Sequence, residues 1–167
     1  MSDTKEYLEF LNNKKKVRAS ENFTLFELYF SHDSLYRYGI KNIPSNNAEA
    51  LRTEGNFNEL VAHVLQPVRY HFKKPVNVTS AYRSVALNNK IGGSDKSQHC
   101  LGMAADFVIR NISLLEIVKF IAKNLQFDQL ILERSKGKNW IHVSYNVKRN
   151  RKQVLKYEHG VYLPLIV

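Results

Sequence analysis

The chain has 167 residues, which is the size of one domain and long enough to bury a hydrophobic core without covalent cross-links. A single cysteine excludes an intramolecular disulfide and fits a reducing compartment. No run of about 18 apolar residues predicts a membrane span, and the N-terminus lacks the pattern of a secretory signal. The formal net charge of +10 suits nucleic acid, an anionic cell surface or only a solvated exterior.

The N-terminal half of the sequence predicts helices. Residues 1–20 are expected to form a short helix or a frayed arm, ahead of a single domain over residues 21–167. Thr24 and Glu27 have the spacing of a capping box at the start of a short helix. A longer helix is expected over residues 47–72, because apolar side chains recur at helical spacing along one face. They are Leu60, Val61, Val64, Leu65 and Val68.

The C-terminal half predicts strands separated by short helices. The segment 75–84 (PVNVTSAYRS) predicts a strand and a turn, and residues 104–110 (AADFVIR) predict a buried strand. A second capping box, at Ser113 and Glu116, opens a helix with an apolar stripe. Its predicted members are Leu114, Leu115, Val118 and Ile121. With a last strand in the tail, the elements predict an α+β fold in which helices flank a small antiparallel sheet.

Two further strands, DQLILE and NWIHVSY, are expected to form a hairpin joined by RSKGK. Side chains alternate between the two faces of a strand, so His142 is expected on the face opposite to that of the apolar Ile141 and Val143. On the partner strand, Gln129 and Glu133 share a face. That face is expected to lie on the same side of the sheet as His142, an assignment that depends on the register of the hairpin.

His99 and Asp106 lie seven residues apart in GGSDKSQHCLGMAADFVI, residues 92–109. His99 precedes the buried strand and Asp106 lies at its head, where a carboxylate is costly unless something neutralises it. The glycine and alanines between them are expected to leave space around the carboxylate. With His142, they offer two imidazoles and one carboxylate, the ligand set of a zinc site that keeps a fourth position for water. Such an ion lowers the pKa of its water and polarises a carbonyl.

Each of these residues also has a simpler interpretation. A lone histidine in a loop or strand is more often a surface or packing residue, and Asp106 could pair with an arginine. Cys100 is expected to be a small buried residue rather than a ligand, because adjacent side chains rarely reach the same metal ion. The other histidines have no ligand spacing and are expected to be structural: His32, His63, His71 and His159.

Three stretches together form a more specific pattern: TSAYRS (79–84), NNKIGGSDKSQHCLGMAADF (88–107) and WIHVS (140–144). The second contains S-x-H-x-x-G-x-A-x-D, which begins at Ser97, and the third contains W-I-H. This pattern resembles the zinc D-alanyl-D-alanine carboxypeptidase family, which has the hedgehog/DD-peptidase fold. The resemblance extends over about residues 22–164. More narrowly, the chain resembles the small single-domain branch of bacteriophages and prophages.

The resemblance implies that His99, Asp106 and His142 bind one Zn²⁺ ion, the same three residues that the spacing suggests. It also implies that Arg83 lies beside the ion and holds the substrate or the developing oxyanion. A guanidinium suits this role because it stays charged and offers several donors. The alternative for Arg83 is a surface salt bridge.

The resemblance identifies the catalytic base less directly than it identifies the metal ligands. Better-known members carry an acidic residue three positions before the last histidine, and that position here is Asn139, which cannot accept a proton. Sequences of the phage-type branch resemble this one in having QLI-x-E, which ends at Glu133. Glu133 is therefore expected to be the general base and later the general acid, with Asp95 and Asp128 as weaker candidates.

The implied function is hydrolysis of peptide bonds in peptidoglycan stem peptides by a metal-activated water, as a D-Ala-D-Ala carboxypeptidase or an endopeptidase. Ser97, Gln98 and Gln129 are expected to bind this substrate. A monomer made in the cytoplasm would act on the cell wall after release, like an endolysin, or as part of a virion. Asn139 keeps open a non-catalytic, zinc-stabilised wall-binding or virion module. Nucleic acid is not expected as a partner, because the His–Asp–His set would then have no purpose.

Overall fold

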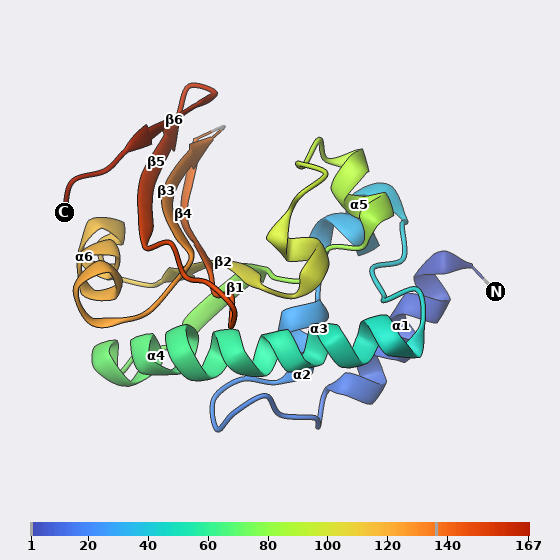
Figure 1. Cartoon of the computed structure of the whole chain (residues 1–167). Helices are drawn as coiled ribbons and strands as arrows, with labels where there is room; N and C mark the ends of the chain where they lie inside the picture. The colour runs from blue at the N-terminus through green and yellow to red at the C-terminus, as the bar shows by residue number, and fades with distance from the viewer. Residues whose placement is uncertain (1, 136) are drawn as a thin grey trace.

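The computed structural model describes residues 2–135 and 137–167. A sheet and a group of helices stand side by side above one long helix (Figure 1). The α-helices are α1 (Asp3–Lys14), α2 (Leu25–Tyr29), α3 (Asn47–Leu60), α4 (Gln66–Phe72), α5 (Val85–Lys90) and α6 (Leu114–Asn124), and the π- and 3₁₀-helical turns are η1 (Asp33–Tyr38), η2 (Val61–Leu65) and η3 (Gln98–Leu101). The strands are β1 (Val76–Ser80), β2 (Ala104–Ile109), β3 (Gln129–Ser135), β4 (Lys138–Ser144), β5 (Gln153–Glu158) and β6 (Val161–Pro164).

The strand order is β1-β2-β4-β3-β5-β6. The predicted α+β class is confirmed, but the sheet is mixed rather than wholly antiparallel, because β3 and β5 run parallel. The tail adds two strands instead of one. His159 and Gly160 both have positive φ, at 53° and 81°, which is the geometry of a two-residue hairpin turn between β5 and β6.

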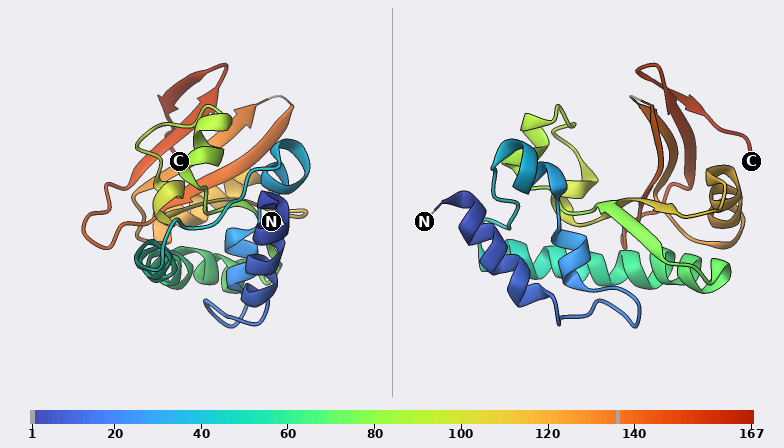
Figure 2. Two further views of the ribbon diagram at one scale, coloured as in Figure 1. Left: turned by 90° about the vertical axis from the view of Figure 1, so that its right-hand side faces the viewer. Right: turned by 180° about the vertical axis from the view of Figure 1, so that it is seen from behind.

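The predicted long helix is confirmed, and α3, η2 and α4 form it together (Figure 2). All five residues of its predicted apolar stripe are buried. Gly55 and Pro67 do not interrupt it. Instead, the π-helical turn η2 ends at Leu65, two residues before Pro67, and the Gln66 N–H donates to the Val61 carbonyl. Proline has no N–H to donate, so the irregular turn lies where the regular helical ladder would lose a bond.

The sheet has one face in the core and the other turned away from it. Phe107, Ile141 and Val143 lie on the core face and are fully buried. Helix α6 packs against β3 and β4 on this face. Its start is confirmed, since the Ser113 hydroxyl accepts the Glu116 N–H. No described helix is both long and apolar enough to cross a lipid bilayer.

The predicted stripe of α6 was wrong at one position. Leu115 is 44% exposed, whereas Ile117 is fully buried. The core-facing side chains follow the regular i, i+3, i+4, i+7 spacing from Leu114, which is partly buried, and Leu115 is outside that series. The predicted β3–β4 loop, RSKGK, was also too long, because the ladder continues to the pair Ser135 and Lys138. Position 136 of the predicted loop is outside the described residues.

Candidate metal centre

Three buried side chains from different elements converge on one point. His99 lies on η3, Asp106 on β2 and His142 on β4, and the last two are direct partners across the β2–β4 ladder. Asp106 Oδ1 lies 2.9 Å from His142 Nδ1 and 3.2 Å from His99 Nε2, and the two nitrogens are 3.2 Å apart. The structure therefore brings together all three predicted ligands, which form a group able to hold a metal ion.

The hydrogen bond on the far side of the His99 ring sets its tautomer. His99 Nδ1 lies 2.6 Å from the Ala81 carbonyl oxygen, which can only accept, so Nδ1 carries the proton. Nε2 then presents a lone pair to the other two groups. Burial lowers the pKa of His99, which favours this neutral form. Tethering the outer ring nitrogen is how proteins orient a metal-binding histidine.

The spacing of the three atoms fits a divalent ion. Tetrahedral zinc sites have bonds of about 2.0–2.2 Å, which places their ligand atoms roughly 3.3–3.6 Å apart. The separations of 2.9–3.2 Å here need to widen by only a few tenths of an ångström. Facing lone pairs repel unless a cation or a proton lies between them. The donor set therefore suits Zn²⁺, for which imidazole and carboxylate are usual ligands.

Arg83 holds the other oxygen of Asp106. Its Nη2 lies 2.5 Å from Asp106 Oδ2, and its Nε donates to the Ser80 hydroxyl at 3.0 Å. Burial raises the pKa of Asp106, but His99, His142 and Arg83 overcome this effect and hold it well below its usual range. The side chain of Arg83 is mostly buried, so its salt bridge is not a surface one. Arg83 thus orients the carboxylate at the centre of the group.

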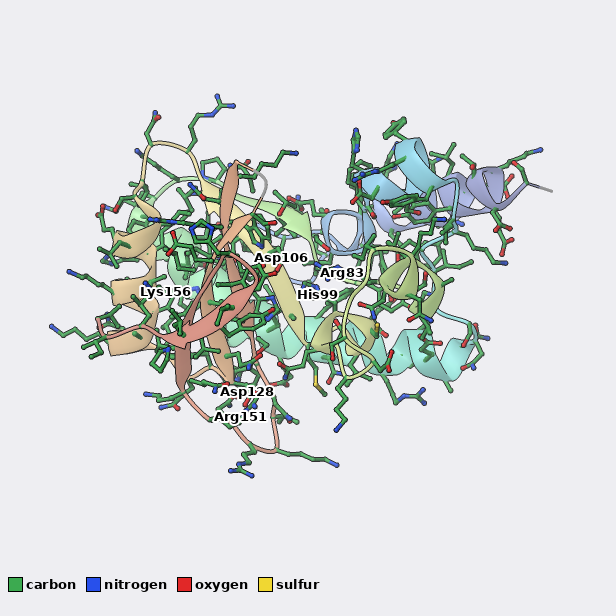
Figure 3. The ribbon with its side chains drawn as sticks, turned by 90° about the horizontal axis from the view of Figure 1, so that it is seen from above. Arg83, His99, Asp106, Asp128, Arg151 and Lys156 are labelled. Carbon is green, nitrogen blue, oxygen red and sulfur yellow. The ribbon has the colours of Figure 1, made fainter. Side chains whose placement is uncertain are left out.

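A cavity of about 630 Å³ contains the three converging side chains and lies between two parts of the chain. One wall comes from residues 91–99 and the other from the sheet, and in Figure 3 Arg83, His99 and Asp106 meet where these walls join. Ser97, Gln98 and Gln129, the predicted substrate-binding residues, all line it. The cavity is also lined by three residues of the C-terminal part for which the sequence shows no site pattern: Arg151, Leu155 and Tyr162.

Glu133 lines the same cavity. It pairs with Trp140 across the β3–β4 ladder, which places it on the face of His142, as the alternation predicted. Burial, and then the charge of Asp106, raise its pKa to about 6. Asn139 pairs with Arg134 instead and lies on the opposite face.

The two weaker candidates for the general base, Asp95 and Asp128, fit the site less well than Glu133 does. Asp95 is exposed and is not among the cavity-lining residues. Asp128 is buried, and hydrogen bonds from Arg151 and Gln98 occupy both of its oxygens. Arg151 is the main reason why the pKa of Asp128 is lowered. A carboxylate held in this way is a poor proton acceptor, so Glu133 is the better placed acid.

Gly102 has a different role from the one expected. It has a φ of +70°, and a Cβ there would lie 2.7 Å from the Thr53 carbonyl oxygen. The glycine therefore makes room for η3 to close against α3, not for the carboxylate of Asp106. Because η3 carries His99, this contact fixes one candidate ligand.

The remaining cysteine and histidines stay outside the metal-competent group. Cys100 is only partly buried, so the expectation of a buried residue was wrong, and burial still raises the pKa of its thiol. The His63 ring stacks on Tyr145, and His71 stacks on Phe120, which agrees with the structural roles expected for these two.

A buried His–Asp–His group that lines an open cavity has the donor set of a metal centre within reach of a ligand, as metal-dependent hydrolases have. The family model for Peptidase M15 matches residues 22–144, which include all three candidate ligands, Arg83 and Glu133. The chain therefore belongs to the Peptidase M15 family, and the resemblance to zinc D-alanyl-D-alanine carboxypeptidases is confirmed. This membership supports a metallopeptidase. A search of the curated proteins finds no match.

Proposed function

We propose that this protein is a zinc-dependent peptidase that hydrolyses a peptide bond in bacterial peptidoglycan stem peptides. One observation carries the proposal: the group His99, Asp106 and His142 shares a cavity with the partly buried carboxylate of Glu133. Membership of the Peptidase M15 family supports the reaction class. A D-Ala-D-Ala carboxypeptidase and an endopeptidase both fit these features.

His99, Asp106 and His142 would hold the ion, which when bound supplies a water of lowered pKa and polarises the scissile carbonyl. Glu133 accepts the proton of the attacking water and later donates it to the leaving amine. A carboxylate with a pKa near 6 suits both steps, because it exchanges protons readily near neutral pH. Arg83, already beside Asp106, donates to the oxygen on which negative charge develops.

The substrate would lie along the cavity between residues 91–99 and the sheet. Gln98 donates its amide N–H to Asp128, and Gln129 donates to Gln153. These bonds orient both amides, and their oxygens can then accept N–H groups of a peptide backbone. Ser97 lies on the same wall and offers a hydroxyl.

The alternative is a non-catalytic wall-binding or virion module. Its support is the amide Asn139 in place of an acid, and the carboxylate of Glu133 in the cavity supports the peptidase instead. We propose that the protein acts as a monomer on the cell wall after release, or as part of a virion of the bacteriophage type.

The test is an assay of the purified protein, loaded with one equivalent of Zn²⁺, on peptidoglycan and on a stem pentapeptide. We expect new free amines, which disappear with a chelator, return with added zinc and are absent with Glu133→Ala. Mass spectrometry of the products identifies the bond. A protein that binds zinc and peptidoglycan but releases no amine would overturn the proposal in favour of a binding module.

A further inference from the structure

An ion pair between the buried Asp128 and the partly exposed Arg151 lies beside the cavity, apart from the metal centre. The carboxylate of Asp128, a residue only 3% exposed, accepts hydrogen bonds from Arg151 Nε at 2.7 Å and Nη2 at 2.6 Å. It also accepts the Arg151 backbone N–H and the side-chain N–H of Gln98. In Figure 3 the pair lies apart from Arg83, His99 and Asp106. These hydrogen bonds, which we call the Asp128–Arg151 clamp, connect Gln98 to the loop between β4 and β5. Gln98 is the residue next to His99.

The clamp presents part of the Arg151 guanidinium to the cavity. The Arg151 side chain is 44% exposed and lines the cavity, although its Nε and Nη2 are engaged by Asp128. Its Nη1 makes no hydrogen bond within residues 2–135 and 137–167. An arginine held in this way has already lost most of its rotational freedom, so it is a preorganised donor for a carboxylate. Lys96, on the opposite wall, adds a second positive charge.

The register of the sheet gives the spacing along the backbone between Asp128, which holds Arg151, and the candidate ligand His142. The Asp128 N–H donates to the carbonyl of Ser144, which lies two residues beyond His142 on β4. Two to three residues along a strand correspond to about 7–10 Å. An extended peptide covers the same distance in about two to three residues.

We propose that Arg151 binds a carboxylate of the substrate peptide, two to three residues away from the bond that is cleaved. The inference rests on the proposed function and names the substrate class: an acidic peptide. Arg151 lies outside residues 22–144, the segment that the family model matches, as do Leu155 and Tyr162 on the same wall. The C-terminal part of the chain would therefore select the substrate, while the matched part carries the reaction.

The test compares two synthetic stem peptides that differ in one group. Once the cleaved bond is known, the carboxylate two or three residues from it is either left free or converted to its primary amide. We expect the zinc-loaded protein to favour the free acid by about 10- to 100-fold in kcat/KM, as for a hydrogen bond between charged groups. Arg151→Gln should remove this preference by slowing cleavage of the acid alone. Arg149→Gln removes the same charge from an exposed position of the same loop and should leave the preference intact.

A second variant distinguishes the loss of the carboxylate site from a folding defect. Arg151→Gln leaves the buried Asp128 without its cation, which can destabilise the domain. The double variant Asp128→Asn/Arg151→Gln removes both charges, and its melting temperature and zinc content show whether it is folded. If the folded double variant still prefers the acid, or the wild type cleaves both peptides equally, the Arg151 proposal is overturned.

Calorimetric titration of stem pentapeptides that carry each carboxylate in turn as the free acid or as its primary amide needs no knowledge of the cleaved bond, and it separates this proposal from the proposed function. If none of these peptides is cleaved, the peptidase assignment fails. Tighter binding of the acid than of the amide, lost with Arg151→Gln, still supports the carboxylate site, and equal binding of the two overturns it.

Discussion

Glu133 and Asn139 lie on opposite faces of the β3–β4 hairpin, and of the two only Glu133 borders the cavity with His99, Asp106 and His142. Asn139 pairs with Arg134, so an acid at position 139 would point away from the candidate ligands. The amide at that position therefore removes no proton acceptor from the site. The hairpin register instead makes Glu133 the candidate base.

Replacing Glu133 should separate catalysis from metal binding. We expect Glu133→Gln to lower kcat by about 10²- to 10⁴-fold, the usual contribution of a general base, while one zinc per chain is retained. Activity and zinc content are measured on the same preparation. Glu158→Gln is the matched control, because Glu158 pairs with Arg134 away from the cavity and should leave kcat unchanged. A similar loss in both variants, or loss of zinc with Glu133→Gln, would contradict the role of Glu133.

The same residue predicts an acid limb in the pH dependence. Glu133 works as a base only when ionised, so kcat/KM should fall as the pH drops below its pKa. Burial and Asp106 raise this pKa to about 6, and a bound cation would lower it. The limb should therefore have its midpoint at or below about pH 6. Profiles from pH 4.5 to 8, with zinc content checked at each pH, test this; a limb unchanged by Glu133→Gln would come from another group.

Arg83 should affect both zinc affinity and turnover. Removal of its bond to Asp106 Oδ2 leaves the carboxylate free to rotate, so Arg83→Ala should weaken zinc binding by about 10- to 100-fold. Competition with a chromogenic chelator measures the affinity. Arg83→Lys keeps the charge without the fork and should recover only part of it. Arg134→Ala, which removes an exposed arginine, should have no effect. Zinc affinity that is identical in all three variants would rule out an orienting role for Arg83.

Gly102 should be intolerant of any side chain. Gly102→Ala incurs the cost of a positive φ, about 1–2 kcal/mol, and also forces η3 away from Thr53. Gly160→Ala is the control, because Gly160 has a φ of +81° but open space around it. Urea denaturation should show that Gly102→Ala lowers the free energy of unfolding by at least about 1 kcal/mol more than Gly160→Ala. Equal losses of unfolding free energy in the two variants would mean that the close packing of Gly102 against α3 contributes nothing to stability.

The parts of the site that the sequence predicted depend on local periodicity. Alternation along a strand places Glu133 and His142 on one face once the hairpin closes, and both strands are short and adjacent in sequence. Helical spacing likewise predicted the buried face of the helix over residues 47–72. These patterns predict the structure because one face of each element must be buried.

The parts that could not be predicted depend on contacts between distant segments. No local pattern shows that β5 would lie parallel to β3, and this pairing brings Leu155 and Tyr162 to the cavity. The clamp between Asp128 and Arg151 joins residues from separate strand ends. Gly102 shows the same limit: its contact is with Thr53 on α3, not with its neighbours in the motif.

The central claim is that His99, Asp106 and His142 bind one divalent ion. Anomalous diffraction at the zinc absorption edge, from crystals of the zinc-loaded protein, tests it most directly. We predict a single peak bonded to His99 Nε2, Asp106 Oδ1 and His142 Nδ1 at about 2.0–2.2 Å. A peak held by other residues, or no peak at this cluster in crystals soaked with excess zinc, would contradict the account.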